Sequence, residues 1–301
     1  MVLPLLPILD NVDLKSERLS EKTLQIIGHA FVQCNGSTLN SLIKTLSNVS
    51  SKLDLIVDSE GLSTDQLIQL LDAGAAKIVV AKSQLPDLSD VPAERILLRT
   101  SEDQVATPAG IEDVVDSTAG IILDSSFTLS VDPESLRSIV TSTRKSLLPT
   151  GGQRSVFMHF SGITSPPAIA ELKSLALLSI TPVLSAQYLT SSSKENTSLL
   201  SIAQIALLSA KTDRADGLYT TVVTDERDHA LGLVYSSAES VAETIKTGRG
   251  VYQSRERGLW YKGHTSGATQ EILGMSWDCD ADCLRYTVRQ FGKGYFLCYQ
   301  C

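Results

Sequence analysis

The chain has 301 residues, of which 43% are apolar and 20% are charged, a composition typical of a folded globular protein. Its net charge of −8 argues against a surface that binds nucleic acid. No run of about 18 uncharged apolar residues occurs, so no membrane-spanning helix is expected. The N-terminus, MVLPLLPILD, is broken by prolines and has no basic flank, which predicts a buried strand rather than a signal peptide.

The N-terminal part of the chain alternates short apolar runs with amphipathic segments. Strands are predicted at 2–9, 29–33, 54–58, 77–81, 95–99, 120–124, 155–160 and 180–185. Helices are predicted between them, for example at 63–74 and 132–148, with Ser63 or Thr64 as the N-cap of the first and Gly74 as its C-cap. Nearly continuous apolar strands that alternate with helices predict a parallel sheet, and about eight such units predict a βα barrel or a degenerate relative of one.

This α/β region carries few chemical signals. The glycine pair in LPTGGQ (148–153) precedes a strand, which favours a turn over a phosphate-binding loop. His29 and His159 fall within predicted strands and are expected to be hydrogen-bonded core residues. Asp124 ends a predicted strand, where the active sites of barrels gather, but the sequence shows no partner for it.

The order of predicted strands and helices changes after a Ser-rich loop (190–198) and a helix near 199–210, because strands then follow one another closely. Strands are predicted at 219–226, 231–237, 250–256 and 270–280, with one helix at 237–248 that stops at Gly248. This pattern predicts a smaller α+β domain. The domain boundary is placed near residue 211, so that the domains are 1–210 and 211–301.

The segment SWDCDADCL (276–284) places alternating acids beside two cysteines. On a continuous strand, the three acids would share one face and the two cysteines the other. Carboxylates suit Mg²⁺ and thiolates suit Zn²⁺. Residues i and i+4 of a flat strand lie about 13 Å apart, so three acids on one ion require the strand to curve or end there. An exposed acidic strand end remains the commoner explanation for alternating acids alone.

The segment GVYQSRERGLWYKGHTSG (250–267) concentrates basic and hydroxyl side chains in an otherwise acidic chain. Arginine forks, hydroxyls and accessible backbone N–H groups are the donors that phosphate recognition uses. Basic residues two apart on a strand are, however, often only solvated. The segment therefore predicts either a phosphate site or a strand with solvated basic residues.

Together, GLVYSS, GRGVYQSRERGLWYKGHTSG and DCDADCL closely resemble phosphoribosyl-AMP cyclohydrolase, an enzyme of histidine biosynthesis, over about residues 211–294. The junction TDRADGLYTTVV is similar to that of the fungal multifunctional histidine protein, in which this domain follows an N-terminal region of about this size. The resemblance implies hydrolysis between N1 and C6 of the adenine ring of phosphoribosyl-AMP. In the family, a zinc-bound water is the attacking group.

The resemblance also implies roles for individual residues. Cys279 would be a zinc ligand, with the remaining cysteine ligands coming from a partner subunit, which implies a homodimer. The implied Mg²⁺ ligands are Asp278, Asp280 and Asp282. The implied substrate-binding residues are Ser254, Arg255, Arg257, Lys262, Thr265 and Ser266. The resemblance names no general acid or base, and His264 is expected to be a bystander.

The C-terminal segment GKGYFLCYQC departs from the family pattern. The two remaining zinc cysteines of the family are separated by six residues, whereas Cys298 and Cys301 are separated by two, a spacing that occurs at other zinc sites. SRERGLW is also one residue shorter than the family spacing. The divergence after Gly294 predicts a truncated product or a misread exon end, without the downstream domains of the fungal protein.

Three hypotheses follow from the sequence. The first is a metal-dependent cyclohydrolase. The second is a catalytically incomplete member that binds a phosphorylated ligand. The third makes the barrel-like region a scaffold that positions the smaller domain. Four of the five cysteines crowd into the last 23 residues, unlike a spread disulfide framework, which predicts a soluble protein of a reducing, cytoplasmic compartment.

Overall fold

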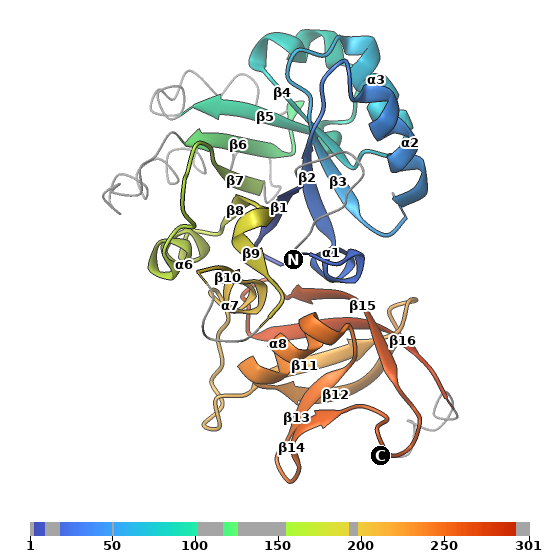
Figure 1. The fold of residues 1–301 in the computed structure, drawn as a ribbon, viewed down its shortest axis with the longest axis vertical. Helices are drawn as coiled ribbons and strands as arrows, with labels where there is room; N and C mark the ends of the chain where they lie inside the picture. Colours follow the sequence, from blue (N-terminus) through green and yellow to red (C-terminus); the bar gives the residue numbers. More distant parts are fainter. Residues whose placement is uncertain are drawn as a thin grey trace. The chain divides into compact units, whose positions relative to one another are not determined.

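The chain divides into two compact units. A computed structural model describes residues 3–9, 19–49, 51–101, 117–125, 155–192 and 198–292 (Figure 1). The barrel unit comprises Pro4–Ser16 and His29–Tyr188. The second unit comprises Met1–Leu3, Glu17–Gly28 and Leu189–Cys301, so the boundary expected near residue 211 falls inside it. The predicted helix at 132–148, the glycine pair at 148–153, and Cys298 and Cys301 lie outside the described residues.

The barrel unit contains a closed barrel of eight parallel strands, as the sequence predicts. The strands run in chain order around the barrel, each beside its neighbour in sequence, and β8 closes on β1. They are β1 (Leu6–Leu9), β2 (His29–Gln33), β3 (Asp54–Asp58), β4 (Lys77–Val80), β5 (Ile96–Ser101), β6 (Gly120–Ser125), β7 (Ser155–Phe160) and β8 (Ile180–Ser185).

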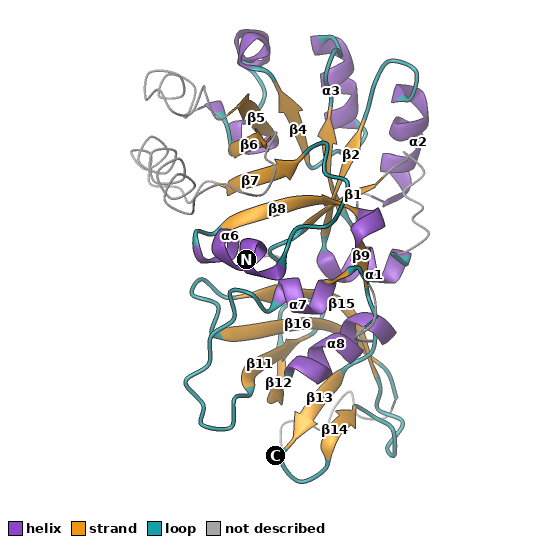
Figure 2. Cartoon of the chain, turned by 60° about the vertical axis from the view of Figure 1, so that its left-hand side comes forward, coloured by secondary structure: helices purple, strands orange, loops and turns teal. Residues whose placement is uncertain are grey.

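Helices connect several of these strands (Figure 2). They are α2 (Leu39–Val49), α3 (Thr64–Asp72) and α6 (Ile169–Leu177), with short 3₁₀ helices at Lys82–Leu88 (η1), Ala93–Arg95 (η2) and Ala186–Tyr188 (η6). Ser63 is the N-cap of α3 and forms a capping box with Gln66. The C-cap is Ala73 rather than Gly74, which follows it at a φ of 109°.

The barrel interior is filled by one apolar side chain from each strand. Side chains alternate between the two faces of a strand, so alternate residues point inward. The buried layer consists of Leu6, Phe31, Ile56, Val79, Leu97, Ile122, Phe157 and Val183. His29 is buried as predicted, and its Nε2 lies 2.7 Å from the carbonyl oxygen of Leu5.

The second unit is built on a four-stranded mixed sheet in the order β12-β11-β16-β15, with β13 and β14 as a separate hairpin. The strands are β9 (Leu189–Thr190), β10 (Leu200–Ser201), β11 (Tyr219–Thr224), β12 (Ala230–Ser236), β13 (Val251–Ser254), β14 (Gly258–Tyr261), β15 (Gln270–Trp277) and β16 (Cys283–Gln290). The helices are α1 (Glu21–Ile27), α7 (Ile202–Ala206) and α8 (Ala238–Thr247). This confirms the predicted α+β class.

Helix α8 lies within the predicted range 237–248 and ends at Gly248, the predicted stop. Ser237 caps its N-terminus by accepting a hydrogen bond from the Ser240 backbone N–H at 3.1 Å. Gly248 ends it in the left-handed region, with a φ of 68°. The helix buries Val241 and Ile245, which anchors it to the unit's core.

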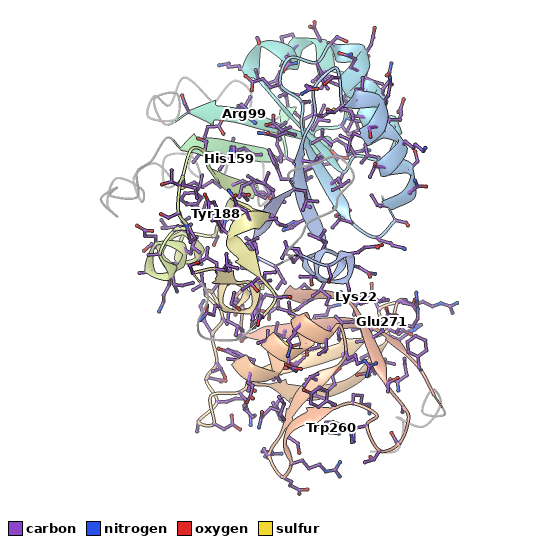
Figure 3. All side chains as sticks on the ribbon, viewed as in Figure 1. Lys22, Arg99, His159, Tyr188, Trp260 and Glu271 are labelled. Carbon is purple, nitrogen blue, oxygen red and sulfur yellow. The ribbon has the colours of Figure 1, made fainter. Side chains whose placement is uncertain are left out.

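Helix α1 also belongs to the second unit, although it lies near the start of the chain. It packs against β15, and its Lys22 Nζ lies 2.6 Å from Glu271 Oε1 of that strand (Figure 3). In the described part of the chain, no helix is both long and apolar enough to cross a membrane.

Candidate active site

The three acids of the SWDCDADCL segment lie in the loop that joins β15 to β16, named here the acid loop (residues 278–282). The predicted strand at 270–280 ends at Trp277, so the acids do not alternate along a strand. Ala281 adopts a φ of 62°, which turns the chain back sharply. As a result, carboxylate oxygens of Asp278, Asp280 and Asp282 come within 4.8 Å of one another.

Asp278 holds the acid loop in shape. Its Oδ1 accepts hydrogen bonds from the backbone N–H groups of Asp282, at 3.1 Å, and Cys283, at 3.2 Å. The Asp278 backbone N–H in turn donates to the Cys283 carbonyl at 3.1 Å. Asp278 is thus a structural residue of the loop as well as a candidate ligand, whereas Asp280 and Asp282 are exposed.

The acid loop concentrates negative charge. Burial acts to raise the pKa of Asp278, but hydrogen bonds from Cys283 and Asp282 outweigh it and bring that pKa below its ordinary value. The pKa of Asp282 is raised, first by its hydrogen bond to Asp278 and then by the charges of Asp280, Asp278 and Asp213. Carboxylates crowded in this way repel one another, and a bound cation would relieve the repulsion.

The two cysteines of the segment lie in different surroundings. Cys279 is exposed in the acid loop, with its Sγ 3.9 Å from Asp280 Oδ1. Cys283 is half-buried at the start of β16, with its Sγ 3.6 Å from the Leu284 carbonyl oxygen. Burial and the Asp278 charge raise the pKa of the Cys283 thiol. Among the described residues, Cys279 is therefore the thiol that is placed to reach a metal beside the acids.

The sequence-predicted phosphate-binding residues lie at two turns around the β13–β14 hairpin. The hairpin tip carries Ser254, Arg255 and Arg257, and Ser254 Oγ accepts a hydrogen bond from the Arg257 backbone N–H at 3.2 Å. The turn after β14 carries Lys262, Thr265 and Ser266. In the described residues, no hydrogen bond or ion pair joins these turns to the acid loop.

Trp260 stands on β14 of this hairpin (Figure 3). Its ring lies 5.3 Å from Lys262 Nζ and 6.2 Å from the Tyr252 ring. Trp260 therefore packs against Tyr252, its cross-strand partner, and holds the ammonium group of Lys262 by a cation–π contact.

The segment 211–217, where the domain junction is predicted, connects the two parts of the site. The Lys211 backbone N–H donates to the Ala281 carbonyl at 2.8 Å, which ties the segment to the acid loop. The guanidinium carbon of Arg214 lies 4.0 Å from the centre of the Tyr235 ring, and that of Arg255 lies 5.8 Å from the same centre. Arg214 is held by two hydrogen bonds to Asp216, of 2.9 and 2.6 Å. The cluster of charges in TDRADG is the signal by which this segment could be found.

Gly263 permits the turn that carries Lys262 and Thr265. Its φ is +81°, and a Cβ there would lie 2.4 Å from the carbonyl carbon and oxygen of Ala268. Gly267, in the same turn, also has a positive φ (+73°), but a Cβ there would meet nothing within 4 Å. An alanine at position 267 would therefore meet backbone strain alone, whereas an alanine at position 263 would meet both backbone strain and a steric collision.

Gly263→Ala is expected to destabilise the second unit more than Gly267→Ala. A left-handed alanine costs about 1–2 kcal/mol, the expected loss for Gly267→Ala. In Gly263→Ala the collision adds to this strain, for a total of more than about 3 kcal/mol. Urea unfolding followed by tryptophan fluorescence measures both, because Trp260 and Trp277 lie in this unit. Equal losses would contradict the close approach of residues 263 and 268.

A small α+β unit that gathers three carboxylates in one loop and presents arginines on a neighbouring hairpin is typical of an enzyme domain that acts on a phosphorylated small molecule. The family model described as phosphoribosyl-AMP cyclohydrolase matches residues 232–300. The chain is 38% identical over 293 residues to the histidine biosynthesis bifunctional protein of Schizosaccharomyces pombe, covering 97% of this chain and 69% of that protein. It therefore belongs to the fungal multifunctional histidine-biosynthesis protein family, and its second unit contains the phosphoribosyl-AMP cyclohydrolase domain.

Two further relatives show how the similarity is distributed. The histidine biosynthesis trifunctional protein of Komagataella pastoris is 32% identical over 309 residues, covering 98% of this chain but 33% of that protein. The phosphoribosyl-AMP cyclohydrolase of Roseobacter denitrificans is 45% identical over 78 residues, covering 25% of this chain and 61% of that protein. The chain thus spans about a third of its trifunctional relative.

Proposed function

We propose that the second unit hydrolyses the bond between N1 and C6 of the adenine ring of phosphoribosyl-AMP, a step of L-histidine biosynthesis, and that it needs metal ions to do so. The observation that supports metal dependence is the convergence of three carboxylates in the acid loop, next to the exposed thiol of Cys279. The family match supplies the substrate and the reaction class.

The donor set of the acid loop fits a magnesium ion. Its carboxylates are hard oxygen donors, and they lie close enough together to share one cation. The residues proposed to hold Mg²⁺ are Asp278, Asp280 and Asp282. The ion would neutralise the loop and draw in an oxygen-rich part of the substrate, while Asp278 keeps the loop in shape through its backbone contacts.

Cys279 is proposed as a zinc ligand, and one thiolate alone does not complete a tetrahedral site. We propose that Cys298 and Cys301 of a second copy supply further thiolates, which makes a homodimer the expected assembly. A zinc ion so held would make hydroxide available near neutral pH. The chain's own contribution is to expose the Cys279 thiol beside the acid loop.

The hairpin residues are proposed to bind the phosphorylated sugar. Arg255, Arg257 and Lys262 supply positive charge, and the hydroxyls of Ser254, Thr265 and Ser266 supply hydrogen-bond donors. Binding here would orient the adenine ring so that C6 faces the metal-binding residues.

The test is turnover of phosphoribosyl-AMP by the purified full chain, before and after chelation and with Zn²⁺ and Mg²⁺ restored. Activity should disappear on chelation and return with both ions. A wild-type chain that binds the substrate but never turns it over, with any metal, would replace this proposal by the second hypothesis, a ligand-binding member without catalysis.

Asp280→Asn is expected to weaken Mg²⁺ binding and raise the Mg²⁺ concentration that gives half-maximal activity by about 10- to 100-fold. Asp280 is the better target because Asp278 also holds the loop backbone. The measurement is a Mg²⁺ titration of activity at fixed zinc. Glu239→Gln, an exposed acid in the first turn of α8, is the matched control and should leave the titration unchanged. An unshifted titration in Asp280→Asn would remove the acid loop from the metal site.

A further inference from the structure

A second group of chemically active side chains lies inside the barrel unit, one layer above its apolar core. Ile56, Leu97, Ile122 and Phe157 belong to the buried core layer. The residues two positions further along these four strands face the same way, toward the carboxyl end of the barrel. They are Asp58, Arg99, Asp124 and His159, named here the mouth cluster.

The mouth cluster is a continuous chain of ion pairs and hydrogen bonds. Arg99 Nη2 lies 2.6 Å from Asp58 Oδ2, and Arg99 Nη1 donates to Asp124 Oδ2 at 2.5 Å. Asp124 Oδ1 lies 2.8 Å from His159 Nδ1. Figure 3 shows Arg99 and His159 in the barrel unit. Asp124, which has no partner in the sequence pattern, thus gains two from the neighbouring strands β5 and β7.

The solvent exposure of the mouth-cluster side chains increases from Asp58 through Arg99 to Asp124. The Asp58 side chain is 5% exposed, that of Arg99 21% and that of Asp124 30%. Asp58 Oδ1 and Arg99 Nη2 are both buried and, among the described residues, neither has a hydrogen-bond partner, although Arg99 Nη2 lies within ion-pair distance of Asp58 Oδ2. Burying charged groups costs several kcal/mol per ion, and apolar replacements are often no less stable, so stability alone does not account for this layer. An unpaired buried acceptor beside accessible partners is instead typical of a place where a ligand donates.

The charges of the mouth cluster select the ligand. Two aspartates face one arginine, and both carboxylates engage that arginine, so the cluster has no surplus positive charge for an anion. When a carboxyl group is ionised, both of its oxygens accept hydrogen bonds and neither donates one. The fitting ligand therefore presents hydrogen-bond donors without a negative charge.

The two carboxyl groups also differ in their acid–base behaviour. Burial raises the pKa of Asp58 above its ordinary value despite the neighbouring Arg99. Burial also acts to raise the pKa of Asp124, but the hydrogen bond to His159 and the charge of Arg99 bring it below its ordinary value. Neighbouring carboxyl groups with separated pKa values are typical of binding and catalytic sites.

We propose that the mouth cluster is a second small-molecule site of this protein, for a ligand that donates hydrogen bonds from hydroxyl or amino groups. This inference does not depend on the cyclohydrolase activity, because it concerns the barrel unit alone.

The experiment is an NMR titration of the full chain that follows the imidazole Cε1–H resonances. The chain has four histidines, so the His159 signal is assigned by its loss in His159→Gln. The probes are D-ribose for hydroxyl donors, 1,4-diaminobutane for amino donors, and inorganic phosphate as the anion. Ribose or the diamine should shift the His159 signal saturably, and the one that does so identifies the donor group. Phosphate should not shift it.

Asp124→Asn should raise the dissociation constant of the responding probe by about tenfold or more, because a hydrogen bond to a charged group is lost. Asp54→Asn, at the exposed amino end of the same strand as Asp58, is the matched control and should leave it unchanged. If circular dichroism shows that Asp124→Asn does not fold, Asp58→Asn takes its place with the same expectation. The proposal is overturned if neither donor probe saturates, if phosphate alone binds, or if binding survives the folded variant.

Discussion

Cys279→Ser is expected to abolish the turnover of phosphoribosyl-AMP and to lower the zinc content of the purified chain. The proposed zinc site draws on this thiol, and serine is a poor substitute for a thiolate ligand. The loss of kcat/KM should exceed the roughly 10- to 100-fold loss that follows from changing an outer partner of a metal ligand. Because Cys279 is exposed, its replacement leaves packing intact, so thermal unfolding should be unchanged.

Two matched variants make the Cys279 experiment specific. Cys283→Ser changes the neighbouring thiol, which is half-buried and next to the Leu284 carbonyl. Cys34→Ser changes the buried cysteine of the barrel unit. Both should keep zinc and turnover if Cys279 has the role proposed for it. Full activity in Cys279→Ser, or an equal loss in Cys283→Ser, would place the zinc ligands elsewhere.

Trp277→Ala is expected to have the largest effect on stability, a loss of about 3–5 kcal/mol in the free energy of unfolding. Trp277 is 2% exposed and ends β15. Its indole Nε1–H donates to the Ala206 carbonyl at 2.8 Å, and its ring meets the Tyr219 ring edge-on at 5.7 Å. The variant leaves both a cavity and a carbonyl that has lost this donor.

Urea unfolding measures the Trp277 effect, with the fluorescence of the remaining Trp260 as the probe. Trp260→Ala is the control, because that side chain is only partly buried on the hairpin and should cost less. Trp277 also directly precedes the acid loop, so the folded fraction of Trp277→Ala should bind Mg²⁺ more weakly. A loss below about 1 kcal/mol would contradict the packing described for Trp277.

The sequence predicts the strands of the barrel closely, because each is a short apolar run with polar flanks. The predicted ranges 29–33, 54–58, 155–160 and 180–185 are those of β2, β3, β7 and β8. The end of α8 at Gly248 is also as predicted, because a left-handed glycine cap acts through local contacts. Local interactions of this kind can be inferred without knowledge of the rest of the fold.

The acid loop could be predicted only in part. The sequence identifies the acids, and the distance argument requires the strand to bend or end if they are to share an ion. The turn itself depends on Ala281, whose backbone lies in the left-handed region. Alanine seldom adopts that conformation, so the residue pattern does not predict it. The strand β16 that follows it was likewise absent from the prediction, as was β14.

Contacts between segments that are distant in the sequence could not be predicted from the sequence pattern. The mouth cluster joins residues of β3, β5, β6 and β7, which only the closed barrel brings together. The pairing of Lys22 with Glu271 spans most of the chain. For the same reason the boundary near residue 211 was set by a local change of character and not by which segments pack together.

The strand order of the second unit sets a lower limit on any separately expressed cyclohydrolase fragment. Strand β11 lies between β12 and β16, yet it precedes residue 232, where the family match begins. A fragment cut at residue 232 would lose the middle of its sheet, and one cut at residue 211 would still lack α1, which packs on β15. A chain that keeps this unit whole must therefore carry residues from both sides of the barrel sequence.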